Sequence, residues 1–199
     1  MAFSRVYVKS AAKVLRLGLI LCMVTAITGM LLGVVERLTS DAIRMTQEKE
    51  KSEALSAVMP KASSFVPVDI ELESDSVITE VHEAFHGGES IGLCVVVVPR
   101  GYAGPIELLV GLTPKGGVQA IRIMRQSETP GLGAKAARPS FWKQFDEKEM
   151  FPLQVVKNSP ALPEEIQAIS GATITSSAVV SGVNAAVAFW EKSYGEGQK

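Results

Sequence analysis

The sequence is poor in the residues that bind metals and haem: its 199 residues include two Cys and two His. A structural zinc site uses four Cys or His side chains, and an iron–sulfur cluster usually takes four thiolates. The Cys-x-x-Cys-His motif that attaches haem is absent. His82 and His86 are four residues apart on an expected strand and turn rather than a helix, so we predict no metal site there. Any electrons that this protein carries are therefore expected on an organic cofactor.

Acidic residues are missing from residues 1–16, which contain four bases: Arg5, Lys9, Lys13 and Arg16. All 21 acidic residues come later, against 16 bases, so the rest of the chain has a formal net charge of -5. Binding to nucleic acid requires Lys and Arg clustered on a folded domain, where they neutralise phosphates. The sequence therefore predicts no nucleic-acid partner.

Charged side chains are also absent from residues 17–35, LGLILCMVTAITGMLLGVV. A helix of this length is about 28 Å long, close to the roughly 30 Å of a bilayer's hydrocarbon core. We predict one transmembrane helix over 17–35. Because positive charges collect on the cytoplasmic side, residues 1–16 are expected in the cytoplasm and the main domain outside it. In a Gram-negative source, the helix crosses the inner membrane and the domain is periplasmic.

Two alternatives to a permanent anchor are weaker. A cleaved signal peptide has an apolar core of about 7–15 residues and an A-x-A-like site, and no such site follows Val35. A lipoprotein signal needs a small residue before its Cys, whereas Leu21 precedes Cys22. Gly29 and Gly33 have the G-x-x-x-G spacing that lets membrane helices pack closely, which is compatible with a partner helix.

Beyond the anchor, the patterns predict an α+β domain over 61–199, connected to the membrane by a polar helix over 36–60. Short turns between neighbouring strands predict a mainly antiparallel sheet. The expected strands cover 77–85, 90–99, 105–113, 117–126 and 153–157. The expected helices cover 140–145 and 176–192, and the longer one packs on the sheet.

A glycine-rich loop follows the expected strand at 117–126. It reads SETPGLGAK over residues 127–135. Gly131 and Gly133 permit positive φ and close approach of the backbone, so the loop is able to present N–H groups and Leu132 to a flat ligand. A plain Pro-Gly turn explains the same composition. The residues alone favour the turn.

A second small-residue loop precedes the long helix, in ISGATITSSAVV over residues 169–180. The free N–H groups at the start of a helix attract an anion such as phosphate, and small residues let it approach. The alternative is an ordinary N-cap in which Thr173, Thr175 or Ser176 accepts the hydrogen bond. Taken alone, the loop favours the cap.

Four segments occur in order behind the apolar helix: GYAGPIELLVG (101–111), ETPGLG (128–133), FWKQF (141–145) and SGATITS (170–176). In this combination, the chain resembles the G subunit of the Rnf electron transport complex. The similar C subunit of the sodium-translocating NADH:quinone reductase belongs to the same FMN-binding domain family. The resemblance covers essentially the whole chain and favours a ligand role for both loops.

The resemblance implies a covalently attached FMN. In that family, a separate flavin transferase esterifies the Thr of the Ser-Gly-Ala-Thr motif to the phosphate of FMN, and the matching residue is Thr173. By the same resemblance, Ser170, Gly171 and Ala172 form the loop that the phosphate approaches, and Thr175 is a phosphate neighbour. The phosphate diester retains one negative charge, which N–H groups at the start of a helix stabilise.

The resemblance also implies that Glu128, Thr129, Gly131 and Leu132 lie near the isoalloxazine ring or the ribityl chain. One position departs from the family's pattern. The motif read by the transferase usually has Asp three residues before the Ser, where this sequence has Gln167. Gln keeps the hydrogen-bonding capacity of that position but loses the charge.

The sequence thus predicts a membrane-anchored electron carrier within an ion-translocating Rnf-type complex. Its expected partners are the other subunits of that complex and a flavin transferase. No catalytic acid, base or nucleophile is expected, because the flavin supplies the chemistry, so we expect a carrier subunit rather than a stand-alone enzyme. The alternatives are a membrane-anchored flavin-binding sensor or assembly domain without electron flux, and a structural subunit whose small-residue loop only caps a helix.

Overall fold

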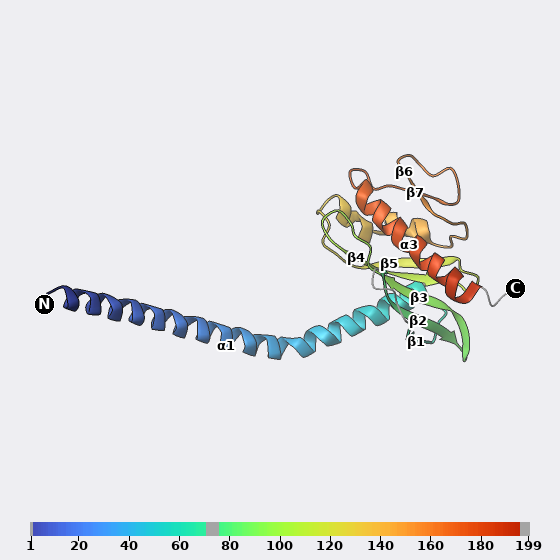
Figure 1. Ribbon diagram of the computed structural model, residues 1–199. Helices are drawn as coiled ribbons and strands as arrows, with labels where there is room; N and C mark the ends of the chain where they lie inside the picture. The colour runs from blue at the N-terminus through green and yellow to red at the C-terminus, as the bar shows by residue number, and fades with distance from the viewer. Residues whose placement is uncertain (1, 71–75, 196–199) are drawn as a thin grey trace. The chain divides into compact units, whose positions relative to one another are not determined.

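The computed structural model describes residues 2–70 and 76–195. The chain divides into two compact units, one up to Lys49 and one from Glu50 onward. Helix α1 runs over Ala2–Val58 (Figure 1), so its last turns belong to the second unit. The predicted anchor and connecting helix are therefore one continuous helix. Its end is explained by Pro60, the first proline of the sequence, because proline disfavours helical backbone in the residue before it.

Among the described residues, two helices are long and apolar enough to cross a membrane. The apolar segment of α1 has none of its span buried within the protein, whereas half of the span in α3 (Thr173–Tyr194) is buried. A helix whose large apolar side chains are all exposed suits surrounding lipid, and a half-buried one suits a domain core. We therefore interpret α1 as the membrane-associated helix and α3 as a core helix.

Five antiparallel strands form one sheet, in which each strand pairs with the next in the chain. They are β1 (Ser64–Val68), β2 (Ile78–His86), β3 (Glu89–Val97), β4 (Ile106–Leu112) and β5 (Val118–Gln126). The α+β prediction is confirmed, and four of these strands lie where the sequence predicts them. The turn between β2 and β3 has positive φ at both Gly87 and Gly88, as a two-residue hairpin turn requires.

The rest of the domain is built from short elements. The 3₁₀ helix η1 (Gly133–Ala137), the helix α2 (Pro139–Trp142) and the 3₁₀ helix η2 (Lys143–Phe145) follow β5 directly. Then β6 (Gln154–Val156) and β7 (Glu165–Gln167) pair in parallel as a separate small sheet. The predicted helix at 140–145 is thus split into α2 and η2, and the predicted strand at 153–157 is β6.

Side chains alternate along the strands, so the large sheet contributes to two cores. Val95 and Val97 of β3 belong to one core, while Cys94 and Val96 belong to the other. Burial raises the pKa of the Cys94 thiol to about 12, so this thiol stays protonated at neutral pH. Figure 1 shows α3 lying over the face of the sheet to which Val95 and Val97 belong.

The face to which Cys94 and Val96 belong is covered by Leu55 and Val58 at the end of α1, and by Met59 directly after it. The approach is close, because a Cβ built on Gly111 of β4 lies 2.9 Å from the carbonyl oxygen of Val58. Only glycine leaves room for the helix end at this point. The glycine-rich loop and the small-residue loop lie on the α3 side of the sheet, where the segment after β5 meets the start of α3.

Candidate functional site

A cavity of about 610 Å³ lies between three segments of the domain. These are the loop between β3 and β4, the loop that leads from β5 into η1, and the start of α3. Such a volume is within the usual range of small-molecule sites. The lining residues are Tyr102, Glu128, Thr129, Leu132, Gly133, Gly171, Ala172, Thr173, Ile174 and Thr175.

Most of the predicted site residues therefore meet in one place. Ser170 and Gly131 are not among the lining residues. Tyr102, Gly133 and Ile174 line the cavity although the sequence did not single them out as ligand contacts. Gly133 and Ile174 stand inside the two motifs, so their position in the sequence was a usable signal. Tyr102 is in the GYAG segment. The approach of this segment to the other two motifs is a tertiary contact, which has no local pattern in the sequence.

Within residues 2–70 and 76–195, no side chain caps the start of α3. The N-cap residue is Ala172, with φ -138° and ψ 47°. The N–H groups of a first helical turn have no partner within the helix. The ordinary N-cap that the sequence favoured is therefore absent, and the helix start is open to another acceptor.

The hydroxyl groups of this segment differ in accessibility. Ser176 is buried, accepts a hydrogen bond from the Ile169 N–H at 2.9 Å and donates one to the Ala172 carbonyl at 3.0 Å. Thr175 is also buried and donates its hydroxyl proton to the Glu128 carboxylate. Thr173 is exposed and lines the cavity. Of these three side chains, Thr173 alone is exposed, although Thr175 also lines the cavity.

The glycine-rich loop is a β-turn that presents a leucine to the cavity. The Leu132 N–H donates to the Thr129 carbonyl at 3.1 Å, and Gly131 between them has a φ of +78°. Pro130 at the second position and Gly131 at the third are typical of a type II turn. The Pro-Gly turn and the ligand role are therefore compatible, since Gly131 forms the turn and Leu132 lines the cavity.

The two loops touch each other. Gly171 has a φ of +76°, and a Cβ built on it lies 3.1 Å from the Leu132 side chain. A side chain at position 171 would be strained by its backbone angle and would press on Leu132. Glycine at this position therefore allows the small-residue loop to approach the glycine-rich loop.

Of the described residues that line the cavity, Glu128 alone is acidic, and it is 4% exposed. Its Oε1 accepts the Ala103 N–H at 2.9 Å, and its Oε2 accepts the Thr175 hydroxyl. Burial acts to raise its pKa, but the hydrogen bonds from Thr175 and from the N–H groups of residues 102–104 outweigh burial and lower it. Glu128 is therefore ionised at neutral pH.

Two other predicted features lie elsewhere. Gln167 is on β7, where its N–H donates to Gln144 Oε1 at 2.8 Å and its side chain is exposed. His82 and His86 are both on β2, and His82 Nε2 lies 3.1 Å from Glu80 Oε2. None of these side chains lines the cavity described above.

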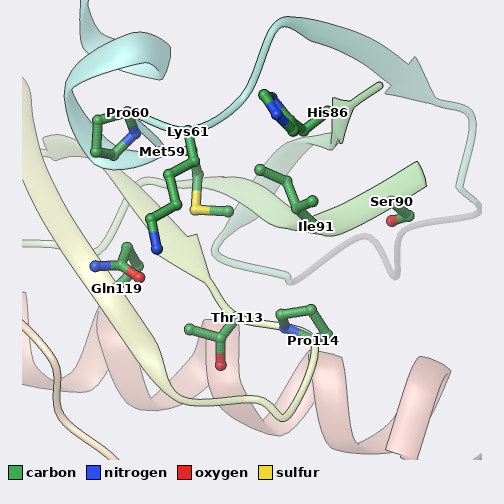
Figure 2. A pocket seen from close by; sticks show the side chains of 9 residues that line it. All are labelled: Met59, Pro60, Lys61, His86, Ser90, Ile91, Thr113, Pro114 and Gln119. Atoms are coloured by element: carbon green, nitrogen blue, oxygen red, sulfur yellow. The ribbon is translucent and has the colours of Figure 1, made fainter. Parts of the chain in front are cut away.

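A second cavity, of about 580 Å³, lies between the end of α1 and the ends of two hairpins. Figure 2 shows its lining side chains, among them Met59, Lys61, His86 and Gln119. None of the residues predicted to hold a cofactor lines it. The first cavity is therefore the candidate site.

Comparisons with known proteins support this choice. The family model of the FMN-binding domain matches residues 101–188, which include all three segments around the first cavity. The G subunit of the Na⁺-translocating ferredoxin:NAD⁺ oxidoreductase complex of Acetobacterium woodii is 35% identical over 192 residues, which cover 89% of this chain and 92% of the relative. The G subunit of the proton-translocating complex of Clostridium ljungdahlii is 36% identical over 161 residues, covering 81% and 83%.

A solved structure has the same fold. It is the C subunit of the Na⁺-translocating NADH-quinone reductase from Parabacteroides distasonis, with a TM-score of 0.56 and 21% sequence identity. The match covers 74% of this chain and 94% of that structure.

Proposed function

Since the chain belongs to the G-subunit family of Rnf-type ion-translocating oxidoreductase complexes, we propose that it carries electrons within such a complex. In this proposal, the carrier is FMN attached through a phosphoester to Thr173. A flavin transferase makes the bond from an activated flavin phosphate. The Thr173 oxygen bonds to phosphorus, the bond from phosphorus to the leaving group breaks, the leaving group departs with that electron pair, and a base of the transferase or water takes the hydroxyl proton.

One observation carries the proposal. Thr173 is exposed and lines the cavity, at the start of a helix that no side chain of the described residues caps. The hydroxyls of Thr175 and Ser176 are buried and hydrogen-bonded. This difference favours attachment at Thr173 over attachment at its close neighbours.

The residues present fit FMN. The first-turn N–H groups of α3 suit a phosphate diester, because they are donors at the positive end of the helix dipole. Tyr102, Leu132 and Ile174 are 69%, 43% and 57% exposed, so they offer an apolar surface that a flat ring can cover. Gly171 provides close approach of the backbone where a Cβ would meet Leu132.

FMN and the protein have separate roles in this proposal. FMN, when bound, accepts and releases electrons, and the protein supplies its position and electrostatic surroundings. With FMN bound, Tyr102, Leu132 and Ile174 would contact the ring and shield it from water. The covalent link keeps the cofactor on a domain that is, in this proposal, outside the cytoplasm.

We also propose where the chain lies in the cell and which proteins it binds. The apolar helix α1 and the relatives indicate association with a membrane. We propose that α1 crosses it once, with the N-terminus in the cytoplasm because four bases and no acid precede the apolar segment. The proposed partners are the other subunits of the complex, and the flavin transferase during maturation.

A reduction experiment separates an electron carrier from a flavin-binding sensor. The assembled complex is mixed rapidly with reduced ferredoxin, the donor type named for the relatives, and the flavin absorbance is followed. The spectrum of the same complex with Thr173→Ala is subtracted to isolate this subunit's flavin. We expect this flavin to be reduced within one turnover of the complex. A flavin that stays oxidised while the complex turns over would rule out the carrier function and favour the sensor.

A further inference from the structure

We propose that Glu128 and Thr175 form a positioning pair, which holds the first turn of α3 so that the Thr173 hydroxyl faces the cavity for flavin attachment. The inference rests on the proposed attachment at Thr173. It gives Glu128 and Thr175 a role through protein contacts, in place of direct contacts with the flavin ring or the phosphate.

Thr175 has no proton to give to a phosphate. Its side chain is 1% exposed, and its hydroxyl donates to Glu128 Oε2. A threonine hydroxyl has one proton, and its remaining lone pairs are acceptors, as phosphate oxygens are. The hydroxyl of Thr175 is therefore committed to the carboxylate.

Glu128 joins three segments that are far apart in the sequence. Its Oε2 binds the first turn of α3 through Thr175, and its Oε1 binds the loop between β3 and β4 through the Ala103 N–H at 2.9 Å. Glu128 itself lies between β5 and η1. An ionised carboxylate has two acceptor oxygens and no donor, which suits a position surrounded by donors.

Two glycines leave the space that this carboxylate fills. A Cβ built on Gly101 lies 2.5 Å from Glu128 Oε1. A Cβ built on Gly133 lies 2.6 Å from Glu128 Oε2 and 2.7 Å from Thr175 Oγ1. Any side chain at either position would displace the carboxylate or break its bond to Thr175. The three segments around the cavity are thus fitted to one buried carboxylate.

The pair can set the direction of Thr173 because both threonines are in the same helical turn. Residues two apart in an α-helix point about 200° apart around its axis. The bond from Thr175 to Glu128 thus fixes the rotation of this turn, in which Thr175 is buried and Thr173 is exposed where it lines the cavity. A misplacement of about 1 Å is enough to slow a chemical step about 100-fold, so loosening this turn should slow attachment.

The test measures the initial rate of covalent flavin incorporation into the full-length chain by a flavin transferase, from the fluorescence of the denatured protein. Thr175→Val keeps the shape of the side chain and removes the hydroxyl, and we expect incorporation at least ten-fold slower. Thr175→Ser restores the hydroxyl, and we expect a rate within two-fold of the unmodified chain. Glu128→Gln leaves one acceptor oxygen and adds donors, so it should be as slow as Thr175→Val.

Asn184→Ala is the matched control. Asn184 is on the same helix and makes two side-chain hydrogen bonds with the backbone of Leu153, at 2.9 and 3.0 Å, away from the cavity. We expect this variant to lose stability without losing incorporation, with stability read from the fluorescence of the two Trp residues during urea unfolding.

The outcomes are distinct. If the chain without substitutions takes up no flavin, the proposed function is overturned, and the positioning role with it. Normal uptake by both the unmodified chain and Thr175→Val would overturn the positioning role alone. Uptake that falls in Asn184→Ala as it does in Thr175→Val, in step with stability, would show a merely structural role and also overturn it.

Discussion

Thr173→Ala is expected to abolish covalent flavin while leaving the domain as stable as the unmodified chain. The hydroxyl oxygen is the atom that bonds to phosphorus, and alanine has no substitute for it. The side chain is exposed, and substitutions at such surface positions usually change stability by no more than about 0.5 kcal/mol. The loss of flavin would therefore come from the missing hydroxyl rather than from unfolding.

The measurement is flavin fluorescence of the full-length chain on a denaturing gel, after coexpression with a flavin transferase. Ser170→Ala and Ser177→Ala remove the two exposed hydroxyls nearest in sequence, and both should keep the fluorescent band. Thr173→Ser restores a hydroxyl and should recover it. A band that persists in Thr173→Ala would show that the flavin is attached elsewhere.

Phe145→Ala has the largest expected effect on stability. Phe145 is fully buried in the core that the sheet shares with α3, and its ring meets that of Phe141 edge to face, with 5.6 Å between the ring centroids. Replacing a buried Phe by Ala removes apolar contacts and leaves a cavity, at a cost of about 3–5 kcal/mol. Because a domain of this kind is stable by about 5–15 kcal/mol, the variant should unfold at a much lower urea concentration.

The two Trp residues make this measurement possible on the full-length chain in detergent. Trp142 and Trp190 are both in the unit from Glu50 onward, so their fluorescence follows the domain and not the apolar part of α1. Met150→Ala is the control, because Met150 is 55% exposed and its truncation should change stability by no more than about 0.5 kcal/mol. An unchanged midpoint in Phe145→Ala would contradict the core described for this domain.

The parts of the fold that the sequence predicted well are those set by local patterns. Gly87-Gly88 and the alternating residues around it indicate a hairpin, and β2 and β3 follow. Strand β1 was not predicted, because Pro67 argues against a central strand; the strand lies at the edge of the sheet, where a missing N–H is tolerated. Strand β7 is three residues long, too short to give a pattern.

The candidate site, too, was predicted only as far as local motifs allow. The motifs, together with the resemblance, selected residues that meet in one cavity, because each motif is a local segment. They did not reveal that Thr175 donates to Glu128, since those residues are 47 positions apart and their contact leaves no local pattern. For the same reason, Tyr102 was not predicted to lie beside Leu132, although both line the cavity.

The most direct test of covalent FMN at Thr173 is the intact mass of the chain extracted from membranes, followed by mapping of its tryptic peptides. Cleavage after Lys157 and Lys192 releases one peptide that contains every hydroxyl residue of the small-residue loop. We expect the protein to be heavier by one FMN less one water, with fragment ions that assign the added mass to Thr173. An unmodified mass, or FMN on a different residue of this peptide, would contradict attachment at Thr173.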